Sequence, residues 1–161
     1  MICGCMSEIN GPRQVVLVTC RNRGKENIIT IAWHMPTSFY PSLYAISVGR
    51  TRHSHDMIKN SGAFCVNFMS AEYKDAMELC GSVSGRNTDK FRKSGLIRES
   101  CEKIDCPRIR QALGFLECRV IDIVETGDHT VFIGEVLKSE LKGSGKRLYH
   151  ITGSDYTTSS D

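Results

Sequence analysis

The segment best suited to bind a ligand is the octapeptide Ser47–Ser54, which combines hydroxyl groups, one glycine and two arginines. The apolar run 43–46 before it predicts a buried strand, and residues 56–60 after it predict a short helix that ends at Gly62. The N–H groups and the dipole at a helix start favour anions, and arginine adds forked donors that match phosphate oxygens. Alone, this pattern fits either a phosphate site or a solvated turn with two surface arginines.

A second polar segment, Cys80–Arg86, consists mostly of small residues and is followed by Asp89–Phe91. Its glycines would let the backbone approach a ligand closely. Arg86 and Lys90 could then reach an anion. A flexible surface loop with solvated charges explains the same residues equally well.

Two ring-bearing side chains are further candidates. Trp33, the only tryptophan, lies in Thr30–Pro36 at the end of a predicted strand, whose edge could line a flat aromatic cofactor. A core position with a satisfied indole N–H is the alternative. His129 lies in Gly127–Thr130 at a predicted hairpin tip. It is either a turn residue or a group that donates a hydrogen bond or a proton near neutral pH.

Composition restricts the class of protein. The chain has 161 residues, 40% of them hydrophobic, and a formal charge of +3, which is typical of one globular domain over residues 1–161. No secretory signal and no apolar run of the ~20 residues that span a bilayer is visible, so we expect a cytoplasmic protein without a membrane partner. The mild charge does not favour nucleic acid, and no Rossmann glycine motif, phosphate loop, catalytic triad or zincin motif occurs.

The eight cysteines are many for this length, but they predict neither a disulfide framework nor a metal site. Cytoplasmic thiols are kept reduced, and the pairs Cys3–Cys5 and Cys101–Cys106 lack the spacing of a zinc ribbon. Cys20, Cys65 and Cys118 lie in apolar runs, where we expect them to be small buried hydrophobic residues.

Strands outnumber helices along the chain, and many neighbours look like hairpins. This favours a mainly β fold, an antiparallel β-barrel with peripheral helices. The expected strands are 14–20, 28–33, 43–48, 63–69, 116–124, 130–141 and 148–151, and the expected helices besides 56–60 are 71–80, 88–94 and 107–113.

Taken in order, these segments resemble the flavin reductase-like family, in the branch of flavoredoxins and ferric reductases. The resemblance runs from about residue 12 to residue 151, and it is the ordered set rather than one motif that is specific. The matching stretches are Val15–Cys20, Asn27–Pro36, Tyr44–Ser54, Phe64–Asn67, Cys80–Arg86 with Asp89–Phe91, Leu116–Arg119, Gly127–Thr130 and Gly134–Val136. The start around Cys3–Cys5 and the polar tail 154–161 depart from the family pattern.

The resemblance implies an FMN-binding split β-barrel that acts as a homodimer. It implies an oxidoreductase that transfers hydride from NAD(P)H to flavin and passes electrons to free flavin, ferric iron or a redox protein. The alternative is an FMN electron carrier that does not oxidise NAD(P)H directly. Since the cofactor supplies the difficult chemistry, no protein nucleophile is needed.

The resemblance also assigns roles to residues. Thr51, Arg52 and Ser54 would be the main phosphate donors, and Arg50 would be surface charge. His129 would be the catalytic residue near the nicotinamide. The full set of expected flavin-binding residues is Thr30, Ala32, Trp33, His34, Ser47, Val48, Gly49, Thr51, Arg52, His53, Ser54, Cys80, Gly81, Ser84, Gly85, Arg86 and Lys90.

Overall fold

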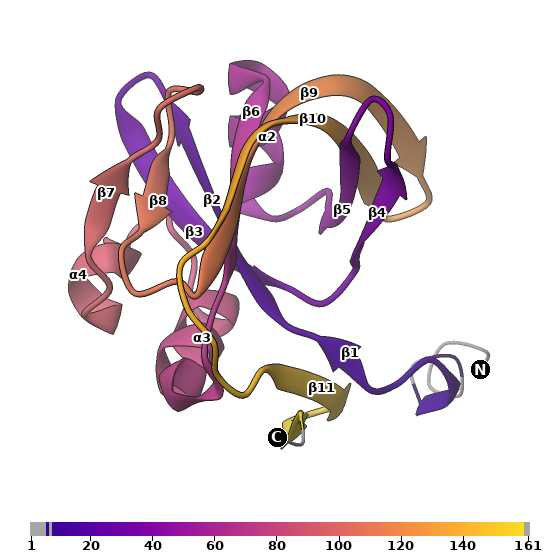
Figure 1. The fold of residues 1–161 in the computed structure, drawn as a ribbon, viewed down its shortest axis with the longest axis vertical. Coiled ribbons are helices and arrows are strands. Elements are labelled where there is room, and N and C mark those ends of the chain that lie inside the picture. Colours follow the sequence, from indigo (N-terminus) through magenta and orange to yellow (C-terminus); the bar gives the residue numbers. More distant parts are fainter. Residues whose placement is uncertain (1–5, 7, 160–161) are drawn as a thin grey trace.

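The computed structural model describes residue 6 and residues 8–159, so the expectation about Cys3–Cys5 lies outside the described residues. Its main element is an antiparallel sheet of seven strands in the order β3-β2-β6-β9-β10-β5-β4. Figure 1 shows β9 and β10 arching over the top, with β4 and β5 on the right. The strands are β2 (Val16–Asn22), β3 (Lys25–Ile31), β4 (His34–Ser38), β5 (Leu43–Gly49), β6 (Ala63–Phe68), β9 (Gly114–Thr126) and β10 (His129–Leu141).

The sheet curls because the chain passes directly from one of its edges to the other. β3 and β4 are the two edge strands, and only Ala32 and Trp33 lie between them. The Ser47 N–H of β5 donates to the Trp33 carbonyl at 2.9 Å. The predicted β-barrel is therefore confirmed.

The long β9–β10 hairpin places His129 at the rim of the barrel. Its strands are joined by Gly127 and Asp128, and Gly127 has a φ of 43°, which suits glycine in a two-residue hairpin turn. The register shifts between Ile133 and Gly134, which marks a bulge that bends the strand. A Cβ on Gly134 would lie 2.7 Å from the Cβ of Cys118, so only glycine fits at this bulge without a shift of its neighbours.

Three helices cover the sheet: α2 (His53–Ser61), α3 (Lys74–Ser82) and α4 (Lys90–Ser94). α2 ends at Gly62 in the left-handed conformation, as its sequence predicts. The predicted helix 71–80 is present as the 3₁₀ turn Ala71–Tyr73 followed by α3. One apolar core lies under α2 and contains Phe64 and Phe132, and a second lies under α3 and α4.

The predicted helix 107–113 is wrong. Residues Pro107–Ile109 form strand β8, which pairs with β7 (Arg98–Ser100) on the left of Figure 1. Pro107 and Ile109 are buried and Arg108 between them is half-buried, which is the period of a strand. The N–H of Ile109 donates to the Asn67 side chain at 2.8 Å, so tertiary contacts replace the helical hydrogen bond.

The expected strand 148–151 is present as β11 (Leu148–Thr152), and it belongs to a second, smaller sheet. The other strands of that sheet are β1 (Arg13–Gln14) and β12 (Asp155–Thr158). Within the described part of the chain, no helix is long and apolar enough to cross a bilayer.

Candidate functional site

Three adjoining hollows form one groove along β3, β5 and the start of α2. The first has a volume of about 250 Å³, the second about 280 Å³ and the third about 540 Å³. The first and second share Thr30 and Arg52 in their walls, and the second and third share Trp33 and Ser47. Ligand sites commonly enclose several hundred cubic ångströms, so the joined groove has room for a nucleotide-sized molecule.

Every predicted site residue lines this groove. The first hollow holds Thr30, Thr51, Arg52, His53, Ser54, Cys80, Gly81, Ser84, Gly85, Arg86 and Lys90. The second holds Thr30, Ala32, Trp33, Ser47, Val48, Gly49, Arg52 and His129. His34 lies in the third, together with Ala32, Trp33 and Ser47.

The first hollow is the cationic end of the groove. Arg52 immediately precedes α2, while Arg86 and Lys90 come from the α3–α4 segment on the other side. Partial burial, together with the charge of Arg86, lowers the pKa of His53. Three cations converging on the N-terminus of a nine-residue helix form an environment suited to a phosphate.

Lys90 is the most deeply placed of these cations, at 5% exposure. Its Nζ donates to the carbonyls of Ile28 and Cys80, each at 2.7 Å, and burial lowers its pKa. An ammonium has three N–H donors, so one is left for a ligand. Burial also raises the pKa of Cys80 to about 11, so this neighbour is a neutral thiol.

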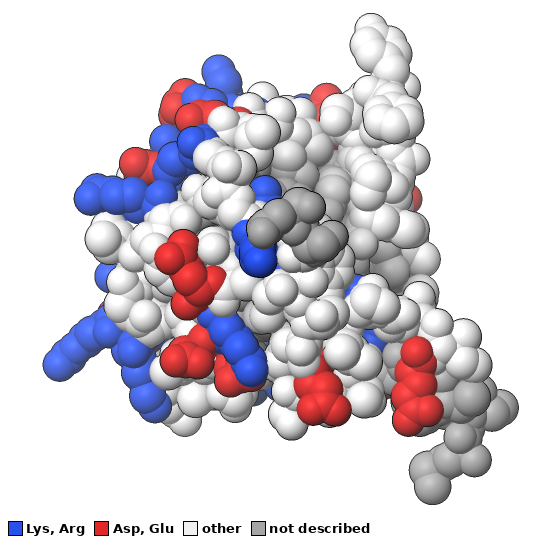
Figure 2. Space-filling model, turned by 60° about the horizontal axis from the view of Figure 1, so that its bottom comes forward, with Lys and Arg blue, Asp and Glu red and all other residues white. Residues whose placement is uncertain are grey.

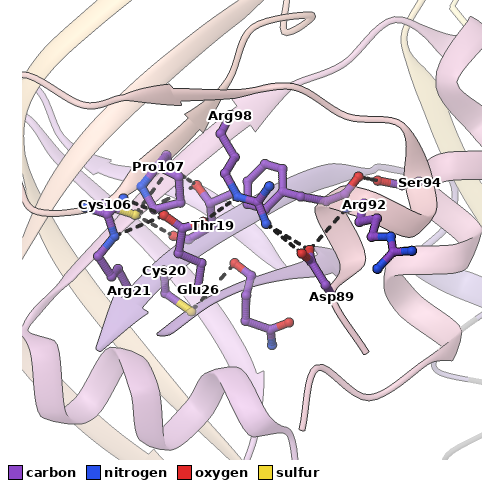
Figure 3. A network of polar contacts seen from close by, with 12 residues as sticks. Thr19, Cys20, Arg21, Glu26, Asp89, Arg92, Ser94, Arg98, Cys106 and Pro107 are labelled. Atoms are coloured by element: carbon purple, nitrogen blue, oxygen red, sulfur yellow. Dashed lines mark hydrogen bonds and ion pairs between the residues drawn. The ribbon is translucent and has the colours of Figure 1, made fainter. Parts of the chain in front are cut away.

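A surface ion network fixes the helix that carries Lys90 (Figure 3). Asp89 caps α4 by accepting the Arg92 N–H at 3.1 Å. Arg98 donates to both carboxylate oxygens of Asp89, at 2.9 and 3.0 Å, and to Glu26 at 2.7 Å. The same contacts bind α4 to β3 and so position the Lys90 ammonium.

Asn27 is a candidate site residue that the sequence did not single out. Its Nδ2 donates to the Ser54 hydroxyl at 2.8 Å, and its Oδ1 is a buried acceptor without a partner in the described structure. A Cβ on Gly85 would lie 2.0 Å from that Oδ1, so only glycine fits there. Since a buried acceptor is costly to leave unpaired, Oδ1 suits a hydroxyl of a ligand in this hollow.

The middle of the groove is aromatic. Trp33 is 41% exposed and its ring lies 4.7 Å from the imidazole of His129, so the core alternative for this tryptophan is wrong. The Nδ1 of His129 lies 2.7 Å from a carboxylate oxygen of Asp128, and this contact lowers the pKa of Asp128. If Nδ1 carries the proton, Nε2 is left to face the groove near Gly49.

His34 is turned into the third hollow, where it is held on both sides. Its Nε2 lies 2.9 Å from the Gln14 carbonyl, so Nε2–H donates and Nδ1 accepts from the Tyr44 hydroxyl at 2.6 Å. Burial lowers the pKa of His34 and raises that of Tyr44 to about 12. Both rings are therefore neutral walls of this hollow near neutral pH.

Arg50 and the core cysteines lie outside the groove. Arg50 is half-exposed and reaches Glu125 at 3.4 Å, consistent with surface charge. Cys20, Cys65 and Cys118 are fully buried, as predicted. Among the described residues, no cluster of His, Cys, Asp and Glu is placed to bind a metal ion.

The curled sheet and the groove together define a split β-barrel of the flavin reductase type. The family model described as "Flavin reductase like domain" matches residues 9–159. The chain therefore belongs to the flavin reductase-like family, and the resemblance drawn from the sequence is confirmed.

Several relatives agree with this assignment. A protein of Archaeoglobus fulgidus is 38% identical over 70% of this chain and 64% of its own length, so this chain spans less than two thirds of that relative. A ferric-chelate reductase (NAD(P)H) of the same organism is 28% identical over 69% of this chain and 68% of its own. The solved flavoredoxin of Desulfovibrio vulgaris (Miyazaki F) superposes with a TM-score of 0.84 at 25% identity, covering 93% of this chain and 88% of that one.

Proposed function

We propose that this protein is one domain over residues 1–161 that binds FMN. It would use NAD(P)H to reduce an acceptor such as free flavin, ferric iron or a redox protein. The observation that carries the proposal is the continuity of the groove, in which a cationic end adjoins an aromatic middle. FMN has two matching parts: a phosphate that a cationic end would bind and a flat ring that an aromatic wall would contact. The family and the ferric-chelate reductase relative support the activity.

The residues divide along the groove by chemistry. Thr51, Arg52 and Ser54 would hold the phosphate at the start of α2, with Arg86 and Lys90 opposite. The unpaired Oδ1 of Asn27 would accept a hydrogen bond from a hydroxyl of the ribityl chain. The ring would lie along the edges of β3 and β5, and the remaining contacts would come from Thr30, Ala32, Trp33, His34, Ser47, Val48, Gly49, His53, Cys80, Gly81, Ser84 and Gly85.

Bound FMN would supply the redox chemistry, and the protein would bind, orient and shield it. With the Nδ1 proton directed at Asp128, the Nε2 of His129 would accept a hydrogen bond from the carboxamide N–H of the nicotinamide above the ring. Asp128 would hold the imidazole by its Nδ1 in the orientation that this requires.

A second protomer would complete the site. Met35 in β4 and the following residues Phe39 and Tyr40 are exposed, the last two at 97% and 99%. In the view of Figure 2, most Lys and Arg side chains lie on the left of the molecule and few lie on the right. Figure 1 places β4 on that right side. Because contiguous exposed apolar residues mark interaction surfaces, we propose that this side forms the homodimer contact. Light scattering should give a dimer mass, and a monomer that retains bound FMN would refute this part.

The test of the activity is anaerobic mixing of the FMN-loaded protein with NADH or NADPH. The flavin absorbance should bleach with at least one of them. His129→Ala should slow bleaching while FMN stays bound. Arg50→Ala, at a surface position that follows β5 and lies beside this hairpin tip, is the matched control and should leave the rate unchanged.

The electron-carrier alternative is favoured by the likeness to solved flavoredoxins. It predicts that neither nucleotide bleaches the flavin, whereas a low-potential protein donor reduces it rapidly. That combination would reject the reductase proposal while leaving the FMN site intact.

A further inference from the structure

Three cysteines gather on the side of the barrel where the β7–β8 hairpin covers β6. Cys106 is 1% exposed, Cys65 is fully buried, and Cys101 is partly exposed at the end of β7. We call these three residues the thiol cluster. They pack around Phe115 and Ile104 in an apolar core of their own, and all three are free thiols. The cluster is separate from the groove, and the proposed function makes no use of it.

Cys101 and Cys106 face one another across the hairpin. The β7–β8 register ends with Ser100 opposite Pro107, and the next pair along is Cys101 with Cys106. The Cys101 N–H donates to the Cys106 carbonyl at 3.0 Å, so the ladder continues through this pair. Directly opposed antiparallel residues have Cα atoms ~4.5–5.5 Å apart, within the ~4.4–6.8 Å that a disulfide spans. A bond between the two sulfurs would therefore leave the strands in place.

A buried carboxylate fixes the loop between them. Glu117 is fully buried, and it accepts the N–H groups of Glu102, at 3.0 and 3.1 Å, and of Lys103, at 2.7 Å. Arg108 reaches the same carboxylate at 3.2 Å. Hydrogen bonds from three donors hold the hairpin tip rigid, so the approach of the two thiols does not depend on a mobile loop.

The thiols differ in environment, which assigns them different roles. The neighbouring Cys106 and Cys65 thiols lower the pKa of Cys101, although burial and the Glu117 carboxylate act in the opposite direction. Burial raises the pKa of both partners. The Sγ of Cys106 instead donates to the Thr19 carbonyl at 3.2 Å (Figure 3). Cys101 is thus the more exposed and more acidic of the two thiols, and Cys106 is the buried thiol beside it.

We propose that Cys101 and Cys106 form a redox-active dithiol that peroxides oxidise to an intramolecular disulfide. The Cys101 thiolate attacks one peroxide oxygen, the O–O bond breaks, and the other oxygen leaves protonated. Cys106 then attacks the sulfenic sulfur, forms the S–S bond, and releases the hydroxyl as water after transfer of its proton. With hydrogen peroxide, two thiols lose two electrons and two waters form. A dithiol reductant reverses the change.

The test is oxidation of the purified protein with stoichiometric hydrogen peroxide, followed by alkylation and peptide mapping. The expected product links the Cys101 and Cys106 peptides and is lost on reduction. Cys20 and Cys118 serve as internal controls and should remain alkylatable after unfolding. A disulfide from Cys101 to any other cysteine, or free thiols at both positions, would overturn the proposal.

Two variants resolve the order of steps. Cys106→Ser should stop at a Cys101 sulfenic acid that a dimedone probe captures, and Cys101→Ser should leave Cys106 unoxidised. Because Cys106 is buried and its variant could fail to fold, a second measurement uses the unmodified protein. The alkylation rate of Cys101 should change little between pH ~6.5 and ~8, since the thiolate is the nucleophile. A rise of about tenfold per pH unit, typical of an ordinary thiol, would contradict the assigned roles.

Discussion

Replacing Lys90 by methionine tests both the fold and the proposed phosphate end of the groove. The change keeps an unbranched side chain of similar length and removes the charge. It deletes two hydrogen bonds of 2.7 Å and leaves the buried carbonyls of Ile28 and Cys80 without this donor. Hydrogen bonds from a charged donor contribute about 1.5–3 kcal/mol each, and relief of the buried charge offsets part of the loss. We expect the free energy of unfolding to fall by about 2–4 kcal/mol.

The same change should weaken FMN binding by more than it weakens riboflavin binding. Loss of one charge-assisted contact to phosphate costs about 1.5–3 kcal/mol, which corresponds to about 10- to 140-fold in Kd. Urea unfolding and FMN titration by fluorescence measure the two effects. Lys93→Met is the matched control on the same helix, because Lys93 is exposed and should change stability by less than about 0.5 kcal/mol. A folded Lys90→Met protein with unchanged FMN affinity would refute the placement of this ammonium at the phosphate.

Substitutions at Asn27, His34 and Gly134 each test a single contact. Asn27→Asp places a carboxylate at the cationic end and should weaken FMN binding by about 2 kcal/mol, roughly 30-fold, with little effect on riboflavin; equal losses for both would contradict the assignment. Because burial lowers the pKa of His34, the unfolded chain binds the extra proton first, so stability should fall as pH drops below about 6.5, and His34→Gln should reduce this slope in acid unfolding curves. Gly134→Ala should destabilise by about 1–3 kcal/mol through overpacking against Cys118, whereas Gly143→Ala, with a nearest contact of 3.6 Å, should be neutral in thermal melts.

The sequence predicted the elements whose residues carry a strong local pattern. The buried runs of β2, β5 and β6 and the Gly62 stop of α2 depend on neighbours in sequence, and all were found. The prediction of a helix over 107–113 was wrong because it depended on Pro107, which suits the first turn of a helix but is equally compatible with a strand at the edge of a sheet. The structure of this segment is decided by β7 and by the Asn67 side chain, which lie far away along the chain.

The candidate site likewise contains residues that the sequence predicted and one residue, Asn27, that it did not. Residues in recognisable motifs, such as Thr51–Ser54 and Cys80–Arg86, were predicted and do line the groove. Asn27 had no such signal, because a single asparagine at a strand start is also a common turn residue. Only the tertiary structure reveals that its Oδ1 is buried, unpaired and against Gly85.

We propose that the groove is an FMN site whose cationic end binds the phosphate. The most direct test is titration of the flavin-free protein with FMN and, separately, with riboflavin, which has the same ring and ribityl chain but no phosphate. We predict saturable FMN binding with a perturbed flavin spectrum, and much weaker riboflavin binding. Equal affinity for the two flavins, or no binding of FMN, would contradict the account.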